Sequence, residues 1–178
     1  MFKYVFILLG LTIFGLIFGL INYLGFFKSV DLEIKTAGPV HFLFQQKIGP
    51  YHEISEKMDD IARKIKPLGL DCKSSIGRFL DDPNQVEQDR LRADIGCVIP
   101  ADYEGDIPQD LTRDLLDKRE YVIAKFNGSP SLGAVKVYPK AQKLMNSRGY
   151  RQDGSIVEIY TLTGDEGVDT EYFFPITK

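Results

Sequence analysis

The stretch VHFLFQQKIGPYHEISEKMDDIARKI, residues 40–65, changes its hydrophobic period at Gly49-Pro50. Before that dipeptide the residues are typical of a strand, with Phe42 and Phe44 on one face. After it, apolar residues recur at helical spacing; they are Ile54, Met58, Ile61, Ala62 and Ile65. Glycine allows a sharp change of direction and proline is pre-set for a first helical turn. The stretch therefore predicts a strand that runs directly into an amphipathic helix.

The remaining elements follow on both sides of this stretch. Strands are predicted at residues 30–36, 76–80, 93–99, 121–126, 156–162 and 170–176. A second helix is predicted over residues 131–147, with a kink or a restart at Pro139, because proline removes a helical hydrogen bond. Residues 110–118 are predicted to form a short surface helix. The predicted fold class is α+β, and the order strand, helix, strand, strand occurs twice.

The two halves also resemble each other locally. Three segments of the first half have counterparts, in the same order, in the second: Lys47-Ile48-Gly49 and Phe126-Asn127-Gly128, Gly77-Arg78-Phe79 and Glu158-Ile159-Tyr160, and Val98-Ile99-Pro100 and Phe173-Phe174-Pro175. We interpret the domain as duplicated strand-helix-strand-strand units with pseudo-twofold symmetry around a groove. Junctions and grooves of this kind are where small-molecule sites tend to form.

The N-terminal segment is the most apolar part of the chain. Residues 4–27 are 24 residues without a charge, bracketed by Lys3 and Lys28. A helix of this length exceeds the roughly 30 Å hydrocarbon core of a bilayer. A secretory signal peptide is the alternative, but its apolar region is usually only about 7–15 residues long and precedes a small-residue cleavage site. The sequence predicts one transmembrane helix in an N-terminal anchor, residues 1–28, and a ligand-binding domain, residues 29–178.

We therefore expect a single-pass membrane protein held through residues 4–27. Its orientation depends on the lysines and arginines at the two ends of the span, because the cytoplasmic side carries the excess. Lys3 and the terminal amine lie on one side, and Lys28 and Lys35 lie on the other. The bias is nearly nil, so the sequence leaves open the side of the soluble domain, and the oligomeric state as well.

Composition excludes several classes of protein. The net charge of -3 argues against a general nucleic-acid partner, because phosphate contacts need a basic face. Cys72 and Cys97 are too few for a disulfide scaffold, and whether they pair is open. With His41 and His52 they make no zinc signature. The sequence contains no nucleotide-binding, calcium-binding or serine-hydrolase motif, so we expect no metal, no cofactor and no catalytic residue.

Three motifs carry a family resemblance. Lys47-Ile48-Gly49-Pro50-Tyr51 stands before a helix, Gly77-Arg78-Phe79-Leu80-Asp81-Asp82-Pro83 ends in a turn, and Glu158-Ile159-Tyr160 lies near the end of the chain. Together they resemble the GyrI-like small-molecule-binding domain, which is also the effector-binding part of AraC-type and multidrug-sensing regulators. The resemblance covers about residues 30–176. It implies two strand-helix-strand-strand units with a ligand groove between them.

A closer likeness is to the membrane-anchored branch of this family, whose animal member is the testis-expressed endoplasmic-reticulum-phagy receptor. Ala37-Gly38-Pro39 and Val137-Tyr138-Pro139-Lys140-Ala141 are similar to that branch, whose members also carry a membrane helix directly before the domain. The receptor's autophagy-binding motif lies in a long C-terminal tail. This chain ends at Lys178, so we expect the resemblance without the tail and without that function.

Glu158 is the residue best suited to bind a ligand. It lies between Val157 and Ile159 in an apolar strand, so it faces either solvent or the groove. The family resemblance implies the groove, where the glutamate at this position meets cationic or polar aromatic ligands. A carboxylate in an aromatic-walled cleft attracts a cation, because Coulomb energy rises as the local dielectric falls and aromatic faces add cation–π attraction. Desolvation is expected to raise its pKa.

Aromatic side chains are the candidates for the wall of this groove. They are Tyr160, Tyr51, Phe79, Phe42, Phe44, Tyr121 and Phe126. The alternative for each is ordinary core packing. Tyr160 and Tyr51 are the best candidates, because a hydroxyl in a cleft needs a hydrogen-bond partner. The predicted ligand-binding residues are Glu158 and the first six of these aromatics.

The sequence therefore predicts a membrane-anchored module that binds a small, aromatic or cationic molecule in a groove between two repeats. It favours a binding module over an enzyme. One alternative is an adaptor that uses the domain surface to bind an unknown protein partner. The other is a hydrolase of reactive small molecules. Family members of that kind use a groove carboxylate and a tryptophan, and this chain has no tryptophan.

Overall fold

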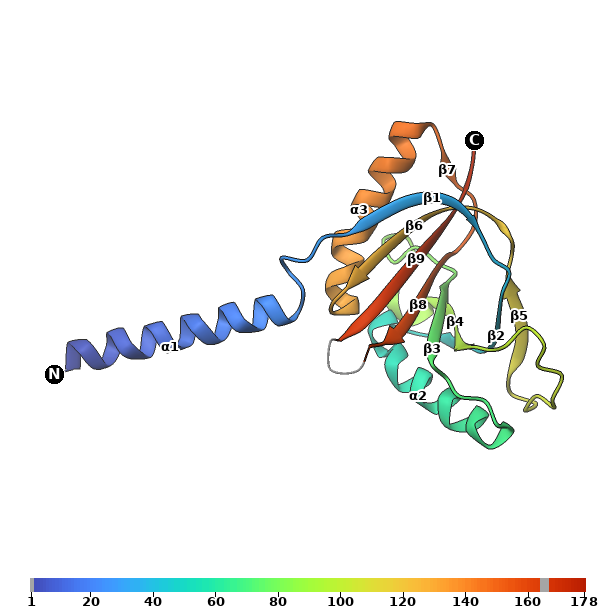
Figure 1. Cartoon of the computed structure of the whole chain (residues 1–178), viewed down its shortest axis with the longest axis horizontal. Coiled ribbons are helices and arrows are strands. Elements are labelled where there is room, and N and C mark those ends of the chain that lie inside the picture. The colour runs from blue at the N-terminus through green and yellow to red at the C-terminus, as the bar shows by residue number, and fades with distance from the viewer. Residues whose placement is uncertain (1, 164–166) are drawn as a thin grey trace.

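The computed structural model describes residues 2–163 and 167–178 (Figure 1). Its helices are α1 (Phe2–Tyr23), α2 (Ile54–Ile65) and α3 (Pro130–Arg148). Its strands are β1 (Asp31–Ala37), β2 (Val40–Ile48), β3 (Ser74–Phe79), β4 (Arg92–Val98), β5 (Thr112–Leu116), β6 (Arg119–Asn127), β7 (Arg151–Gln152), β8 (Ile156–Leu162) and β9 (Val168–Thr177). Single turns of 3-10 helix lie at Tyr51–Glu53, Lys66–Leu68 and Gln88–Arg90. The predicted strand and helix of residues 40–65 are confirmed.

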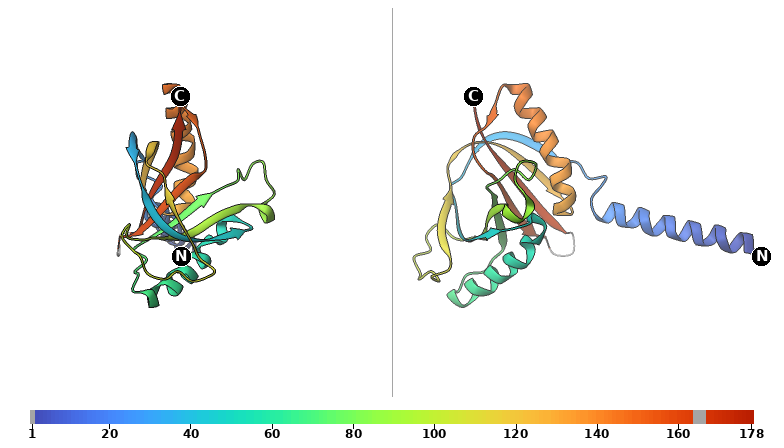
Figure 2. Two further views of the ribbon diagram at one scale, coloured as in Figure 1. Left: turned by 90° about the vertical axis from the view of Figure 1, so that its right-hand side faces the viewer. Right: turned by 180° about the vertical axis from the view of Figure 1, so that it is seen from behind.

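The strands form one antiparallel sheet in the order β1-β6-β9-β8-β3-β4-β2-β5, and the short β7 pairs with β9. The sheet curls into a half-barrel, with β8 and β3 in its middle (Figures 1 and 2). The fold is therefore mixed α and β, as the sequence predicts.

Both domain helices pack on the outer face of the curled sheet. α3 lies against β6 and β9, and α2 lies against β4 and β2. The buried apolar residues under α3 include Val122, Ala124, Phe126, Tyr172 and Phe174. Those under α2 include Leu43, Ala93, Ile95 and Cys97. Because α2 and α3 cover opposite ends of the sheet, the strip formed by β8 and β3 lies between them.

The inner face of the curl carries a third apolar cluster. Its buried members are Phe42, Ile76, Leu116, Tyr121, Ile123, Val157, Ile159 and Phe173. The strands β2 and β6 both contribute to this cluster, although four strands separate them in the sheet. The helices therefore cover the outer face of the sheet. On the inner face, side chains from the two ends of the curled sheet pack against one another.

The turn between β2 and α2 has the backbone that the sequence predicts. Gly49 has a φ of 126°, a region that favours glycine. Its N–H donates to the carbonyl oxygen of Leu91 over 2.8 Å. Pro50 follows with a φ of -57° and precedes the turn Tyr51–Glu53 that leads into α2.

The prediction of a helix over residues 110–118 is wrong. The segment contains β5, which pairs with β2 along the edge of the sheet. A short isolated helix is marginal in water, whereas the free edge of β2 offers a full set of backbone partners. The second helix does not restart at Pro139. α3 runs unbroken through this proline, which lies on the exposed side of the helix.

Cys72 and Cys97 form a disulfide bond, a pairing that the sequence leaves open. Their Cα atoms lie 5.5 Å apart, within the usual range for such a bond. Cys97 is fully buried in β4, and Cys72 lies shortly before β3. The bond ties the connection between α2 and β3 to the middle of the sheet.

The helix α1 projects away from the domain (Figures 1 and 2). Its 22 residues correspond to about 33 Å at 1.5 Å per residue. The segment Lys3–Tyr23 has a mean hydropathy of 2.6, and none of it is buried. The helix is therefore long and apolar enough to cross a membrane, although a signal sequence has the same properties.

Candidate functional site

Glu158 lies in the middle of β8, on the outer face of the sheet and in the strip between α2 and α3. Only 4% of its surface is exposed. The hydroxyl of Tyr138 on α3 donates to Oε1 over 2.5 Å, and the hydroxyl of Tyr160 on β8 donates to Oε2 over 2.7 Å. Both carboxylate oxygens are therefore held by tyrosine hydroxyls.

Three secondary-structure elements position this carboxylate. Alternation along β8 puts Tyr160 on the same face as Glu158. Packing of α3 on the sheet brings Tyr138 over β8. On the other side, Glu158 pairs across the ladder with Gly77 of β3. The ring of Phe79 leans over Gly77, where a Cβ would lie 3.3 Å from it, so the missing side chain makes room for that ring.

Burial dominates the electrostatics of this cluster. It raises the pKa of Glu158 above the usual carboxyl range, and the two tyrosine hydrogen bonds oppose part of the rise. Burial, followed by the nearby charge of Glu158, raises the pKa values of Tyr138 and Tyr160, so both hydroxyls stay protonated and act as donors. Within residues 2–163 and 167–178, no lysine or arginine forms an ion pair with Glu158.

Tyr172 of β9 adds a third hydroxyl to the cluster. It pairs with Glu158 across the ladder, and its ring lies edge-on to Tyr138 with the centroids 6.2 Å apart. Its hydroxyl is buried and makes no hydrogen bond of normal geometry in the part of the chain that the structure describes. Gly133 of α3 leaves room for it, since a Cβ there would lie 2.1 Å from the hydroxyl oxygen.

The sequence does not single out Tyr138 or Tyr172 as site residues. Tyr138 reaches Glu158 only because α3 packs across the sheet, a contact between segments 20 residues apart. Tyr172 reaches it only through the register of β8 and β9. The alternation of β9 was the one available signal for Tyr172. It predicts which side chains of β9 share a face, but it does not predict which strand lies beside β9.

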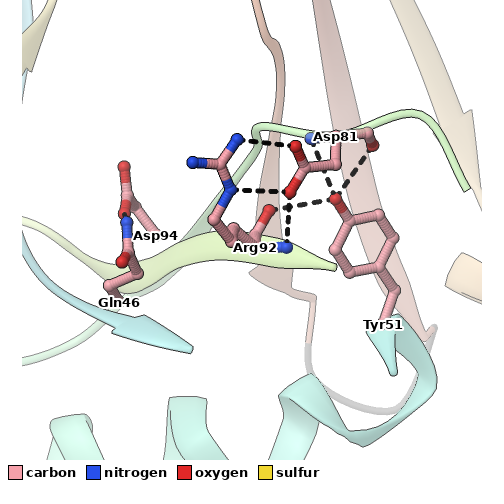
Figure 3. A network of polar contacts seen from close by, with 5 residues as sticks. All are labelled: Gln46, Tyr51, Asp81, Arg92 and Asp94. Carbon is pink, nitrogen blue, oxygen red and sulfur yellow. Dashed lines mark hydrogen bonds and ion pairs between the residues drawn. The ribbon is translucent and has the colours of Figure 1, made fainter. Parts of the chain in front are cut away.

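Tyr51 and Phe79 lie at the α2 side of the strip. Their rings meet edge to face, with centroids 4.8 Å apart. The Tyr51 hydroxyl lies at hydrogen-bond distance from the carbonyl oxygens of Asp81 (2.9 Å) and Arg92 (3.0 Å), as Figure 3 shows. The side chains of Asp81 and Arg92 also form a two-point ion pair over 2.7 and 2.9 Å. Because the connection between β3 and β4 occupies its hydroxyl, Tyr51 has only its ring to offer a ligand.

Phe42, Phe44 and Tyr121 lie on the inner face of the sheet and are not brought to Glu158. The two phenylalanine rings flank the guanidinium of Arg78, whose carbon lies 5.3 Å from each centroid. The Tyr121 hydroxyl donates to the carbonyl oxygen of Asp117 over 2.7 Å. The predicted set therefore divides by face: Glu158, Tyr160, Tyr51 and Phe79 lie on the outer side of the sheet.

Phe126, the remaining aromatic candidate, is buried on the outer face under α3. A surface hollow of about 600 Å³ lies beside it, at the ends of β1, β6 and β9. This hollow is lined by Lys28, Ser29, Asp31, Lys125, Phe126, Asn127, Thr161, Asp169, Thr170 and Glu171. It includes none of the seven predicted ligand-binding residues. Glu158 itself is almost fully covered, and Tyr138 and Tyr160 both donate hydrogen bonds to its carboxylate.

The domain matches known proteins over nearly its whole length. The family model of the GyrI-like small molecule binding domain matches residues 31–177. The chain belongs to this family. The GyrI-like chain is 27% identical over 145 residues to a DNA gyrase inhibitor of Pectobacterium carotovorum subsp. carotovorum (strain PC1). The matched region covers 78% of this chain and 91% of that protein. The family that the three motifs indicate is thereby confirmed.

The GyrI-like fold also matches solved structures. The C-terminal domain of EcmrR superposes with a TM-score of 0.65 and 15% identity, over 84% of this chain and 98% of that domain. A hydrolase from Listeria innocua superposes with a TM-score of 0.57 and 14% identity, over 83% of this chain and 92% of that protein. At these identities the matches show the fold alone.

Proposed function

We propose that this protein is a membrane-anchored GyrI-like domain that binds a small aromatic cation at Glu158. The observation that carries the proposal is a buried carboxylate whose hydrogen-bond partners in the described chain are two tyrosine hydroxyls. An unpaired buried charge costs free energy, so a carboxylate kept only for stability would be paired with a cation. A positively charged ligand supplies the missing partner, and neighbouring aromatic rings supply cation–π faces.

Ligand binding needs a side-chain movement at this site. With 4% of its surface exposed, Glu158 is almost completely covered. Tyr138 and Tyr160 close it, and each is held to the carboxylate by a single hydrogen bond. When one tyrosine turns away, the cation takes its place beside the carboxylate and its ring stacks against the aromatic residues that remain.

We further propose that the two halves of the domain arose by duplication. The strand order β6-β9-β8 on one side of the middle corresponds to β2-β4-β3 on the other. In the sequence, Gly77 corresponds to Glu158, and in the ladder these two residues face each other. A pseudo-twofold axis between them accounts for both facts. It puts Glu158 at the junction of the two halves, where ligand sites tend to form.

The ladders support a second sequence correspondence. We start from the paired residues Gly77 and Glu158 and move one strand at a time toward each edge of the sheet. The strand pairings then lead to Gln45 of β2 on one side and to Ala124 of β6 on the other. This agrees with the matching of Lys47 with Phe126 in the sequence. The third correspondence, between β4 and β9, is displaced by two residues in the ladders. Two of the three local similarities are thus consistent with one symmetry axis.

The anchor is the other part of the proposal. α1 has the length and the apolar composition of a membrane span, and we propose that it stays attached and crosses the bilayer once. Extraction of membranes with alkaline carbonate tests this part by itself, because a spanning protein stays with the lipid. Recovery of the chain in the soluble fraction would contradict it.

One observation favours a second candidate function. A carboxyl group whose pKa is raised by burial is suited to act as a general acid or base, and Glu158 has such a pKa. Hydrolysis of a reactive small molecule at Glu158 is therefore the alternative. The adaptor alternative does not use Glu158, so it predicts no effect of changing this residue on the binding of a protein partner.

The test is a calorimetric titration of the full chain in detergent micelles with N-methylacridinium and with neutral acridine, at mildly alkaline pH. We expect the cation to bind in the micromolar range, about -8 kcal/mol, and more tightly than the neutral ring. Glu158→Gln keeps the size and removes the charge, so it should weaken cation binding by roughly 1–3 kcal/mol. Turnover of the ligand in the same mixture would favour the hydrolase.

The matched control is Glu171→Gln. Glu171 lies on β9 and pairs with Lys125 over 2.6 Å, at a partly exposed position. The substitution Glu171→Gln removes one negative charge from the same sheet, as Glu158→Gln does. A non-specific effect of charge would therefore weaken cation binding in both variants. Equal affinity of the wild-type protein and Glu158→Gln for the cation would overturn the proposed site.

A further inference from the structure

α3 has a charge pattern unlike that of the whole chain. The chain has 22 Lys and Arg against 25 Asp and Glu. α3 has no acidic residue, and its basic residues are Lys136, Lys140, Lys143 and Arg148. The last three form no ion pair with any carboxylate of the described residues. A basic helix on an acidic protein indicates an anionic partner.

The exposed surface of α3 carries Lys140 and Lys143 next to apolar side chains. Four residues of α3 are buried against the sheet at a spacing of four. By helical geometry, Val135, Pro139 and Lys143 therefore point to the opposite side. Val135 is 71% exposed, one of the most exposed large apolar residues of the domain. Apolar residues flanked by lysines on one helix face are typical of a helix that lies in a membrane interface.

The start of α3 is tied to the end of α1. The N–H of Ser129 donates to the carbonyl oxygen of Leu24 over 3.1 Å. The Lys136 ammonium donates to three carbonyl oxygens within residues 25–28, over 2.5 to 3.2 Å. These carbonyls belong to the segment that directly follows α1, which ends at Tyr23. These contacts join the segment after α1 to the first turns of α3.

This junction puts α3 beside the bilayer surface. α1 is about as long as the roughly 30 Å hydrocarbon core, so when it spans the membrane its last turn lies at the surface. In Figures 1 and 2, α3 runs across the direction of α1. The outward face of α3, which points away from the sheet, is on the same side of the domain as α1. A helix in this position lies along the membrane.

We propose that the outward face of α3 rests on the bilayer and binds anionic phospholipid headgroups through Lys140 and Lys143, while Val135 enters the interface. This inference rests on the proposed anchoring by α1. The domain then holds one orientation on the membrane. Tyr138, which covers Glu158, is carried on the same helix, so the site of the proposed cation opens beside a surface where lipophilic cations accumulate.

The absence of tryptophan from the sequence allows a direct test. The full chain with Val135→Trp is reconstituted in vesicles of phosphatidylglycerol and phosphatidylcholine whose acyl chains are brominated near the headgroup. The matched control is Leu115→Trp, at a 38% exposed position on β5, which lies on the side of the domain away from α1 (Figure 1). We expect fluorescence quenching several-fold stronger for Val135→Trp than for Leu115→Trp.

The charge dependence tests the second half of the inference. Quenching of Val135→Trp should fall when phosphatidylcholine replaces phosphatidylglycerol. It should also fall when Lys140→Glu and Lys143→Glu are added. Quenching that is insensitive to both changes overturns the binding of anionic headgroups. Equal quenching of Val135→Trp and Leu115→Trp overturns the contact of α3 with the membrane.

The anchor is measured separately, by alkaline carbonate treatment of vesicles of the same lipids that hold the unsubstituted chain. A chain that is extracted overturns the anchor and, with it, this inference. A chain that resists extraction but shows equal quenching at the two positions keeps its anchor and loses only the contact of α3. The cation titration in micelles is independent of both results.

Discussion

Glu158 and Arg78 are charged groups on opposite faces of two neighbouring strands, β8 and β3. On the inner face, nitrogen atoms of Arg78 lie 2.8 Å from the carboxylates of Asp94 and Asp114, and two phenylalanine rings flank the guanidinium. On the outer face, Glu158 also lies among aromatic rings. Its partners there are hydroxyls. One charge is therefore balanced by the protein itself, and the other is not.

The difference supports a structural role for Arg78 and is consistent with the binding role proposed for Glu158. Removing a charge from water costs several kcal/mol unless a partner of opposite charge compensates, and Arg78 has two such partners. Its aromatic neighbours belong to the packing of the inner face. Glu158 has no cationic partner among the described residues, and its two tyrosine hydrogen bonds offset only part of the desolvation cost. Aromatic residues around a charge are thus weak evidence for a ligand site until the counter-charge has been looked for.

The largest effect is expected on the inner face. Arg78→Leu leaves Asp94, which is 3% exposed, without its ion-pair partner and should lower the free energy of unfolding by about 3 kcal/mol. Lys125→Leu breaks the more exposed pair with Glu171 and should cost at most about 1 kcal/mol. Urea denaturation in detergent measures both. Similar losses of stability in the two variants would contradict a structural role for the ion pairs of Arg78.

A smaller effect is expected from Tyr138→Phe, which removes one donor to Glu158. Stability at neutral pH should fall by about 1–2 kcal/mol, since a hydrogen bond to a charged group is lost. That hydrogen bond lowers the pKa of Glu158, so its loss raises the pKa further. Cation binding, which needs the ionised carboxylate, should then begin at a higher pH in a titration with N-methylacridinium.

Tyr121→Phe is the control for this change. It also removes a buried tyrosine hydroxyl that donates a hydrogen bond, but it does so on the inner face. We expect a comparable loss of stability and no change in the pH at which the cation binds. A shift of that pH in Tyr121→Phe would show that the two faces are coupled.

The smallest effect is expected for the stability of Glu158→Gln in the absence of ligand. The pKa of Glu158 is raised on folding from an ordinary value of 4.5, so ionisation above that pH destabilises the folded state. The variant should match the wild type in acid. It should become more stable than the wild type as the pH rises from 4.5 through the raised pKa. Thermal unfolding across this range measures it, and a wild type that gains relative stability with pH would contradict an uncompensated charge.

Local pattern was enough to predict most of the elements. The strand and helix of residues 40–65 follow from a change of hydrophobic period at Gly49-Pro50, and the β8 strand follows from its apolar alternation. The prediction of a helix over residues 110–118 failed because the secondary structure of this segment depends on a partner that is distant in sequence, the free edge of β2. The pairing of Cys72 with Cys97 also depends on tertiary contact, since the two cysteines are 25 residues apart in sequence.

The candidate site was predictable only in part, for a related reason. Alternation in β8 placed Glu158 and Tyr160 on one face. It could not say that α3 covers that face, so Tyr138 was missed. For Phe42 and Phe44, the pattern of β2 predicted a shared face correctly but not that this face is the inner one. Which face of a sheet the helices cover is set by the connections between strands.

The Cys72–Cys97 bond bears on the compartment in which the domain works. Disulfides persist in the periplasm, in the endoplasmic reticulum lumen and on cell surfaces, whereas cytosolic thiol systems keep cysteines reduced. With the proposed anchor in place, a domain that keeps this bond is expected on the oxidising side, with its first residues in the cytosol. It would then meet cationic compounds before they cross the membrane. Alkylation of both cysteines in freshly isolated membranes, without prior reduction, would assign the domain to the cytosol instead.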